Sequence, residues 1–506
     1  MKHQTLLRQI REAGLSQAHS LDLSDSELLD VPNALAELMA LQHLDLSQNE
    51  LTSLPTAVLS LSGLRSLDLS SNELQTLPDA LINLKELRIL RLSDNHYTEI
   101  PAVIFDLPQL EVLELSANHL TVMPTAIGQL QSLRRLDVSN NGLRKLPDTL
   151  FSLENLERLD VGENALTEIP DALAQLQNLE YLSLKSNELK VLPASLCRLL
   201  NLERLLLNDA GLQQLPDNLG DLQQLKRLEL YGNRLQQLPA SLTQLKALQR
   251  LDLSANRLAS LPTGLLSLPA LHWLSFYDNE LAELPADIAT ASQLLDLDLS
   301  HNLLNEVPDG LWRLPQLQFL DLSYNNLTAL PEDLTLPALQ RLSLNGNDLN
   351  QLPTALFTLT QLQHLDVSYN ALVALPEQMH LPALKILILT GNELPDIPPV
   401  LANLAQLETL AINDNGLLEC PACVQHMAQL QRLDLSDNAL RTLPDWLLSL
   451  PNLEWLNLSH NALKQLPEGM VHQVALKYLD LSANPLKAAG LRAWVAWFGI
   501  AHVRLD

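Results

Sequence analysis

The strongest candidates for a reactive or metal-binding site are two cysteines that lie close together in the sequence. Cys420 and Cys423 form a Cys-Pro-Ala-Cys motif, and His426 follows three residues later. This spacing is typical of redox sites when the motif belongs to a thioredoxin-like unit, while a zinc site would need about four ligands. Cys420, however, stands where other segments of the chain have a leucine before a proline. We therefore expect both thiols to be inert packing residues, with a redox role as the alternative.

Other catalytic signatures are missing from the sequence. There is no Walker A, G-x-S-x-G, H-E-x-x-H, dinucleotide-binding or kinase motif. The thirteen histidines are scattered and never form an HxH or HxxxH set on one expected helix. The sequence thus predicts a protein that is not an enzyme and has no cofactor, metal site or catalytic residue.

The composition narrows the classes of partner. The 506 residues carry 32 Lys and Arg against 59 Asp and Glu, a formal charge of −27. Such an excess of acid argues against binding to nucleic acid or to anionic membranes. No apolar run is long enough to span a membrane, and the first residues do not resemble a signal peptide. With only three cysteines, the expected location is the cytoplasm.

A repeat of about 23 residues organises nearly the whole chain. The pattern LxxLxLSxNxLxxLPxxLxxLxx occurs 21 times, and its Asn position runs from Ser26 through Asn49 and Asn72 to Asn484. The two units that end at Asn347 and Asn392 are one residue shorter than the others. One unit of this length cannot bury its own leucines, so neighbouring units must stack.

This pattern resembles the leucine-rich repeat family, in its 23-residue class, which includes intracellular Ras-signalling scaffolds, related plant proteins and long bacterial effectors. The resemblance implies an α/β solenoid, shaped like a horseshoe, with a concave parallel sheet and convex 3-10 or short helical turns. We expect a capping helix at 1–17, the repeats at 18–487 and a second capping helix at 488–506. Bacterial ubiquitin-ligase effectors that resemble this array carry a catalytic region beyond it, whereas only about 20 residues follow Asn484.

The residues of one unit explain these expectations physically. Leu44 and Leu46 flank Asp45, so a short strand buries one face and exposes the other. The repeat Asn offers both a donor and an acceptor to the backbone as it leaves the strand. The following Pro and LxxL suit a 3-10 turn. Leu6, Leu7 and Ile10 share a face of the first helix, expected to stop at Gly14, and the last helix would bury Leu491, Trp494, Val495 and Phe498.

Four outward positions in each unit remain free to vary, and we number them from the repeat Asn as −6, −4, −2 and −1. Position −4 is acidic in 13 of 21 units, and position −6 is often Arg. Residues two apart on a strand share a face, so Arg135, Arg158, Arg227, Arg250 and Arg432 are each expected to pair with the acid of their own strand. Arg204 and Arg341 have Leu206 and Ser343 there instead, which leaves them available to a partner.

Aromatic residues at these outward positions indicate a binding surface. Six of the seven tyrosines lie there, whereas Phe276 takes a core position and Phe105, Phe151, Trp312 and Phe357 lie on the convex side, where packing explains them. Exposed Tyr, Trp and Arg dominate protein-interface hot spots. The predicted partner-binding residues are Arg204, Arg227, Tyr231, Arg250, Trp273, Tyr277, Phe319, Tyr324, Arg341, His364 and Tyr369.

The predicted function is therefore a non-catalytic scaffold that binds a protein partner on its concave face. One alternative is a bacterial effector secreted into a host cell, and another is a regulatory subunit that recruits a phosphatase or a small GTPase. One irregular unit yields a separate expectation. Ala210 stands where other units have Asn, so a backbone group is left without its amide partner unless Asn208 or a water replaces it.

Overall fold

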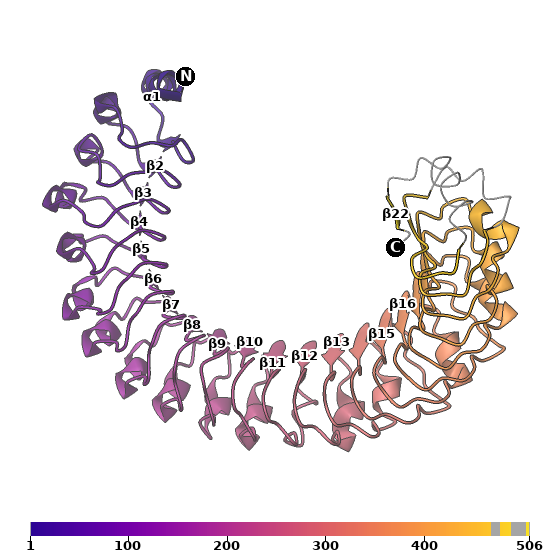
Figure 1. Ribbon diagram of the computed structural model, residues 1–506. Coiled ribbons are helices and arrows are strands. Elements are labelled where there is room, and N and C mark those ends of the chain that lie inside the picture. Colours follow the sequence, from indigo (N-terminus) through magenta and orange to yellow (C-terminus); the bar gives the residue numbers. More distant parts are fainter. Residues whose placement is uncertain (1, 467–475, 487–501, 505–506) are drawn as a thin grey trace. The chain divides into compact units, whose positions relative to one another are not determined.

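The computed structural model describes residues 2–466, 476–486 and 502–504. The chain divides into two compact units, Met1–Arg257 and Leu258–Asp506. Each unit is a stack of repeats with strands on one side and 3-10 helices on the other (Figure 1). The expected α/β architecture is therefore confirmed within each unit.

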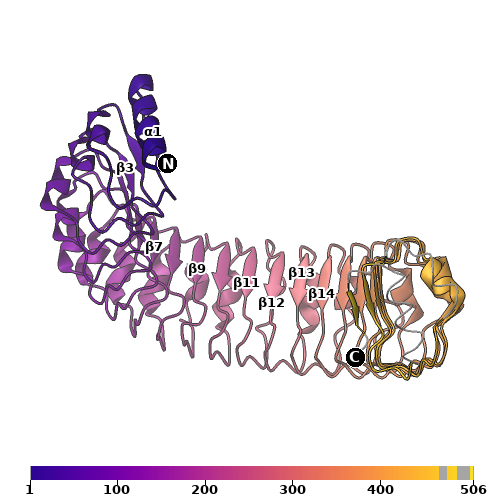
Figure 2. The same cartoon turned by 45° about the horizontal axis from the view of Figure 1, so that its top comes forward.

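Short parallel strands of three residues form the sheet of each unit, as seen in the rows of arrows in Figure 2. Neighbouring strands pair in register at an offset of 23 residues, for example Leu44 with Leu67, and of 22 at Phe319 with Arg341. In the first unit the strands are β1 Ser20–Asp22, β2 His43–Asp45, β3 Ser66–Asp68, β4 Ile89–Arg91, β5 Val112–Glu114, β6 Arg135–Asp137, β7 Arg158–Asp160, β8 Tyr181–Ser183, β9 Arg204–Leu206, β10 Arg227–Glu229 and β11 Arg250–Asp252. In the second they are β12 Trp273–Ser275, β13 Asp296–Asp298, β14 Phe319–Asp321, β15 Arg341–Ser343, β16 His364–Asp366, β17 Ile386–Ile388, β18 Thr409–Ala411, β19 Arg432–Asp434, β20 Trp455–Asn457, β21 Tyr478–Asp480 and β22 His502–Arg504.

The opposite side of each unit carries 3-10 helices, most of which begin directly after the repeat proline. Proline suits this place because its φ is fixed near the helical value and it lacks an N–H to satisfy. In the first unit they are η1 Asn33–Glu37, η2 Val58–Ser60, η3 Asp79–Asn83, η4 Ala102–Asp106, η5 Thr125–Gln129, η6 Asp148–Ser152, η7 Asp171–Gln175, η8 Ala194–Arg198, η9 Leu219–Asp221 and η10 Ala240–Gln244. In the second they are η11 Ala286–Thr290, η12 Leu311–Arg313, η13 Thr354–Thr358, η14 Pro399–Asn403, η15 Ala422–His426 and η16 Asp445–Ser449.

Leucines fill the space between the sheet and the helical turns. Leu44, Leu46 and Leu51 are buried, and so is Phe276, as its core position predicts. The aromatics Phe105, Phe151, Trp312 and Phe357 are also buried beneath the helical turns. The prediction that they pack between repeats is therefore confirmed.

The repeat asparagines form a buried ladder of hydrogen bonds that joins each repeat to the next repeat. Asn72 accepts the N–H of Leu51 at Oδ1 (3.0 Å) and donates through Nδ2 to the carbonyls of Leu46, Leu69 and Ser70 at 3.0–3.2 Å. A buried donor or acceptor without a partner costs about 1–3 kcal/mol. Each Asn therefore contributes through several backbone groups at once, which confirms the bridging role expected from its chemistry.

The irregular repeat that contains Ala210 interrupts this ladder. Ala210 is fully buried, and no hydrogen bond to the Leu189 N–H is present in the described part of the chain. Asn208 does not replace the missing amide, because it bonds Glu229 Oε2 (2.9 Å) and the Tyr231 N–H (3.1 Å). The turn also differs, with φ +76° at Gly211.

The helix α1, Lys2–Ser16, begins the first unit and packs against η1. It buries Leu6 and Ile10, while Leu7 is partly exposed, and it continues through Gly14 to Ser16. At the other end of the chain, β22 pairs with β21. Leu491, Trp494, Val495 and Phe498, expected in the last capping helix, lie outside the described residues.

Candidate functional site

The outward face of each sheet carries side chains at the −6, −4, −2 and −1 positions. The Asp at −4 has a local structural role, because its Oδ1 accepts the N–H and the hydroxyl of Ser at −2. In Asp298 these bonds come from Ser300 at 2.9 and 2.6 Å. The repeated acid is thus held in place by its own strand, and the more variable −6 position distinguishes one repeat from the next.

Four predicted residues lie on the first unit. Arg204 and Tyr231 are exposed, and Arg204 forms no ion pair with any residue that the structure describes. Arg227 donates from Nε to Glu229 Oε1 at 2.6 Å, and the Nε of Arg250 lies 3.9 Å from the same oxygen. Glu229 thus holds two of the four side chains, while Arg204 keeps its charge available.

Seven predicted residues lie on the second unit, and they differ in exposure. Tyr277, Tyr324, Arg341 and Tyr369 are exposed, whereas Trp273, Phe319 and His364 are half-buried on the sheet. Burial lowers the pKa of His364, and the nearby Arg341 lowers it further. His364 is thus a neutral side chain at pH 7 that lies between Arg341 and Ile386 on adjacent strands.

Three of the five expected pairs between Arg and an acid of the same strand are wrong, because Arg135, Arg158 and Arg432 form no ion pair with any residue that the structure describes. Arg158 places its guanidinium carbon 4.5 Å from the ring centre of Tyr181, and Arg432 lies 4.9 Å from the ring centre of Trp455. Arg158 and Arg432 lean across to the next strand because a flat guanidinium stacks well on an aromatic face. Of the predicted pairs, Arg227 with Glu229 is confirmed.

The acids at −4 form rows across neighbouring strands. Burial raises the pKa of Asp321, and the charges of Asp298 and Asp366 raise it further. In the first unit, burial likewise raises the pKa of Asp160, with Asp137 adding to the effect. Like charges stand in register about 4.8 Å apart in these rows. Arg91 compensates Asp68 and Glu114 in the first unit, whereas Asp298, Asp321 and Asp366 form no ion pair with any described residue.

Aromatic side chains stack along the rim of the second unit, and sequence reasoning missed one of them. The ring of His301 lies 5.2 Å from that of Tyr277 and 4.3 Å from that of Tyr324. Tyr324 and Tyr369 hold left-handed backbone with φ +49°, and their rings pack over Gly346 and Gly391 of the next units. The sequence signal for His301 was its −1 position, next in line to Tyr324.

Two further groups on the second unit were also missed. Ile386 and Ile388 on β17 and Ala411 on β18 make an uncharged stretch of the sheet face. Trp455 and Tyr478 stack with ring centres 5.3 Å apart, beneath Arg432. The signal for the first group was two apolar residues at −6 and −4 of the same strand.

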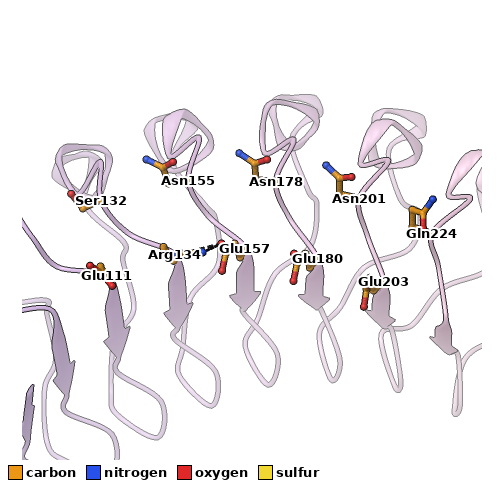
Figure 3. Close-up of a pocket in the computed structure, with 10 residues that line it drawn as sticks. All are labelled: Glu111, Ser132, Arg134, Asn155, Glu157, Asn178, Glu180, Asn201, Glu203 and Gln224. Atoms are coloured by element: carbon orange, nitrogen blue, oxygen red, sulfur yellow. Dashed lines mark hydrogen bonds and ion pairs between the residues drawn. The ribbon is translucent and has the colours of Figure 1, made fainter.

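A groove of about 750 Å³ runs along one side of the first unit, next to the amino-terminal ends of its strands (Figure 3). Glu111, Glu157, Glu180 and Glu203 line it together with Arg134, which bonds Glu157 at 2.9 Å. Asn155, Asn178 and Asn201 each donate to a carbonyl of the preceding repeat at 2.9 Å. These amides join the repeats, so the groove is primarily a structural feature.

Sequence comparison decides the family. The sequence model described as "Leucine rich repeat" matches residues 40–97, 85–143, 131–189, 200–258, 269–327, 337–394, 405–463 and 428–486. A second model, "Leucine Rich repeats (2 copies)", matches residues 315–354. This chain belongs to the leucine-rich repeat family.

Solved structures of other leucine-rich repeat proteins resemble the whole chain. YopM from Yersinia enterocolitica WA-314 is 28% identical with a TM-score of 0.63, covering 95% of this chain and 94% of that one. A TDR receptor is 28% identical with a TM-score of 0.69 and coverages of 94% and 90%. The Arabidopsis receptor kinase HAESA, in complex with the peptide hormone IDA and the co-receptor SERK1, is 26% identical with a TM-score of 0.55 and coverages of 97% and 91%. No curated protein sequence gives a significant match.

The leucine-rich repeat is generally a non-catalytic interaction fold, and the cysteines agree with that role. Burial raises the pKa of Cys197 to about 12 and that of Cys423 to about 11, and it also raises the pKa of Cys420. These thiols stay protonated and unreactive at neutral pH. Among the described residues, no three His, Cys, Asp or Glu side chains are grouped as metal ligands, and no helix is long and apolar enough to cross a membrane.

Proposed function

We propose that this leucine-rich repeat protein is a non-catalytic scaffold that binds a protein partner on the strand-lined face of its repeats. The observation that carries the proposal is the exposure of Tyr231, Tyr277, Tyr324 and Tyr369 on that face. Large aromatics in water contribute little to the stability of the isolated chain, but they are favoured at the centres of protein interfaces. The similarity to a receptor solved with a bound peptide hormone supports a protein or peptide partner.

The proposed contact residues divide between the two units. Arg204, Arg227, Tyr231 and Arg250 belong to the first, and Trp273, Tyr277, Phe319, Tyr324, Arg341, His364 and Tyr369 to the second. Arg204 and Arg341 have the least compensated charge, since neither forms an ion pair with any described residue. They are expected to supply charge, and the aromatics to supply apolar area.

The test is partner recovery with variants of each unit. The tagged chain is purified from its own cells with its partner, and Arg204→Ala and the double variant Trp273→Ala/Phe319→Ala are compared with it. Truncation of a true hot spot lowers binding by at least about 2 kcal/mol. The proposal predicts that the partner is lost while the far-ultraviolet circular dichroism spectrum is kept. Full recovery of the partner with all variants would place the binding surface elsewhere.

A second candidate is an effector that acts in a host cell after secretion by a bacterium. The similarity to YopM across nearly the full length of both chains supports it. A secretion assay with the first 30 or so residues fused to a reporter separates this candidate from a scaffold of the cytoplasm. Transfer of the reporter into host cells favours the effector, and its retention favours the cytoplasmic scaffold.

A further inference from the structure

The sheet face of the second unit changes character between β13 and β18. Asp298 on β13 and Asp321 on β14 pair in register. Three strands further on, Ile388 on β17 pairs with Ala411 on β18. An acidic stretch is thus followed by an apolar stretch along one open face.

The acidic stretch is fixed in position before any partner arrives. The Oδ1 atoms of Asp298 and Asp321 accept the N–H groups of Ser300 and Ser323, both at 2.9 Å. Within the described residues, neither carboxylate pairs with Lys or Arg. The outer oxygens therefore carry negative charge that a basic side chain would compensate.

Aromatic groups beside these acids suit the same basic side chain. Phe319 lies two residues before Asp321 on β14, and the guanidinium carbon of Arg341 is 5.9 Å from its ring centre. The cation at this ring is thus the chain's own Arg341, so the aromatic contacts left for a partner's basic side chain are those of the rim tyrosines. Tyr277 and Tyr324 border the stretch on the rim, where they are 37% and 47% exposed.

The apolar stretch has no charged side chain at its two central strand positions. Ile386 and Ile388 occupy the −6 and −4 positions of β17, and both are half-exposed. The next strand carries Thr409 and Ala411 at the same positions. This apolar surface is exposed to solvent in the isolated chain, and an apolar side chain of a partner would bury it.

The distance between the two stretches sets the spacing in the partner. From β13 or β14 to β17 there are three or four strand intervals of about 4.8 Å, or roughly 14–19 Å. An extended chain advances about 3.3 Å per residue, so this distance corresponds to about four to six residues. Building on the proposed function, we infer that the second unit binds an extended segment of its protein partner, with a basic side chain at Asp298 and Asp321 and an apolar side chain at Ile386 and Ile388.

The test selects peptides from a random phage-displayed library of twelve-residue sequences on the full-length protein. The inference predicts enrichment of sequences with Arg or Lys four to six residues from Leu, Ile, Val, Met or Phe. Synthetic versions of the enriched peptides are then measured by fluorescence anisotropy. Because the basic contact is electrostatic, their affinity should fall as salt rises.

Variants assign the binding to the two stretches. Asp298→Asn/Asp321→Asn and Ile388→Ser are each expected to weaken binding at least about tenfold, an interface contribution of about 1.4 kcal/mol. Both changes use residues that the chain already carries at −4, since Asn457 and Ser343 occupy that position. Glu180→Gln/Glu203→Gln removes two charges from the groove of the first unit and should leave binding unchanged.

Three outcomes would overturn the inference. They are enrichment of acidic peptides, an equal loss of binding in the control variant, and no enrichment of any peptide. The last result would indicate that the occupant is a folded surface and not an extended segment. The proposed function fails separately, when the native partner is recovered in full by the variants of the contact residues.

Discussion

At the scale of single residues, the asparagine ladder shows what one side chain contributes to a repeat. Ala210 leaves the Leu189 N–H without the acceptor that other units supply, and Asn208 is engaged elsewhere. We predict that Ala210→Asn raises the free energy of unfolding by about 1–3 kcal/mol, measured by urea denaturation. A loss of stability would show that the altered turn at Gly211 excludes the larger side chain.

The matched control is Asn187, at the same position of the preceding repeat. Asn187 accepts the N–H of Leu166 at 2.9 Å and donates to the carbonyls of Val161 and Leu184 at 3.1 and 3.0 Å. Asn187→Ala should therefore destabilise the chain by at least the amount that Ala210→Asn gains. If both variants lie within error of the wild type, the ladder is not a source of stability.

Tyr97 is a second residue with an unsatisfied polar group in the core. It is fully buried, and its hydroxyl has no hydrogen-bond partner among the described residues. We predict that Tyr97→Phe raises the free energy of unfolding by about 1 kcal/mol at pH 7. Circular dichroism melts of the two proteins provide the measurement.

The same residue has a pH signature. Burial raises the pKa of Tyr97 above its usual value of 10.0. The unfolded chain therefore releases this proton at lower pH than the folded chain, so stability falls as pH rises past 10. The advantage of Tyr97→Phe should grow between pH 7 and pH 10.5, and an advantage that shrinks would contradict the buried, un-ionised hydroxyl.

The sequence predicts the role of the asparagine but not the partners of the arginines. Asn72 has a single place in a periodic pattern, and its short side chain reaches only the backbone nearby. Arg158 and Arg432 are long enough to reach either their own acid or the next ring, and the choice depends on whether that ring is present. Strand alternation gives the face of a side chain, but not the direction in which it leans.

At the scale of the strands, the rows of acids at −4 make the stability of each sheet depend on pH. The raised pKa of Asp160 comes from burial and from Asp137, so its charge opposes folding at pH 7. As pH falls through the raised pKa, the folded chain takes up the proton first and the penalty disappears. We predict that Asp160→Asn raises the melting temperature at pH 7 and has little effect below the ordinary pKa of 3.8.

The first strand offers a control of opposite sign. Hydrogen bonds from Ser24 lower the pKa of Asp22, so its charge supports folding at pH 7 and that support is lost at low pH. Asp22→Asn should therefore lower the melting temperature at pH 7. The chain already uses Asn in this role, because Asn457 accepts from Ser459 at 3.1 Å and lies 3.4 Å from Asp434. Shifts of the same sign in both variants would refute a common electrostatic cause.

The sequence predicts most elements, because their period is fixed by the buried leucines. The strands and the 3-10 helices lie where the alternation and the proline place them. Three repeats are exceptions in the described part of the chain, because no 3-10 helix follows Pro262, Pro331 or Pro376. The repeat after Pro262 keeps the full 23 residues and has Gly264 at φ +95°. The other two repeats have 22 residues. In the two shorter repeats, removal of one residue leaves too little chain for the helical turn, an effect visible in the sequence only as a missing position.

At the scale of the whole molecule, the division into two units has no counterpart in the sequence. The repeat phase continues through Arg257 and Leu258 without a change in length. The predicted contact residues fall on both units, and the sequence alone identifies them by position. Their exposure depends on neighbouring side chains, which is why Trp273, Phe319 and His364 are half-buried while Tyr369 is 55% exposed.

The proposed function requires that a protein partner contacts the strand-lined face. It is tested most directly by incorporating a photo-cross-linking amino acid at Arg204 and at Tyr369, one exposed site on each unit, in the full-length protein in its own cells. Gln131 and Gln361 are exposed sites away from that face and serve as the matched controls. We predict that the same partner is cross-linked from Arg204 or Tyr369 and not from Gln131 or Gln361. Cross-links formed from the two glutamine sites, with none from Arg204 or Tyr369, would contradict it.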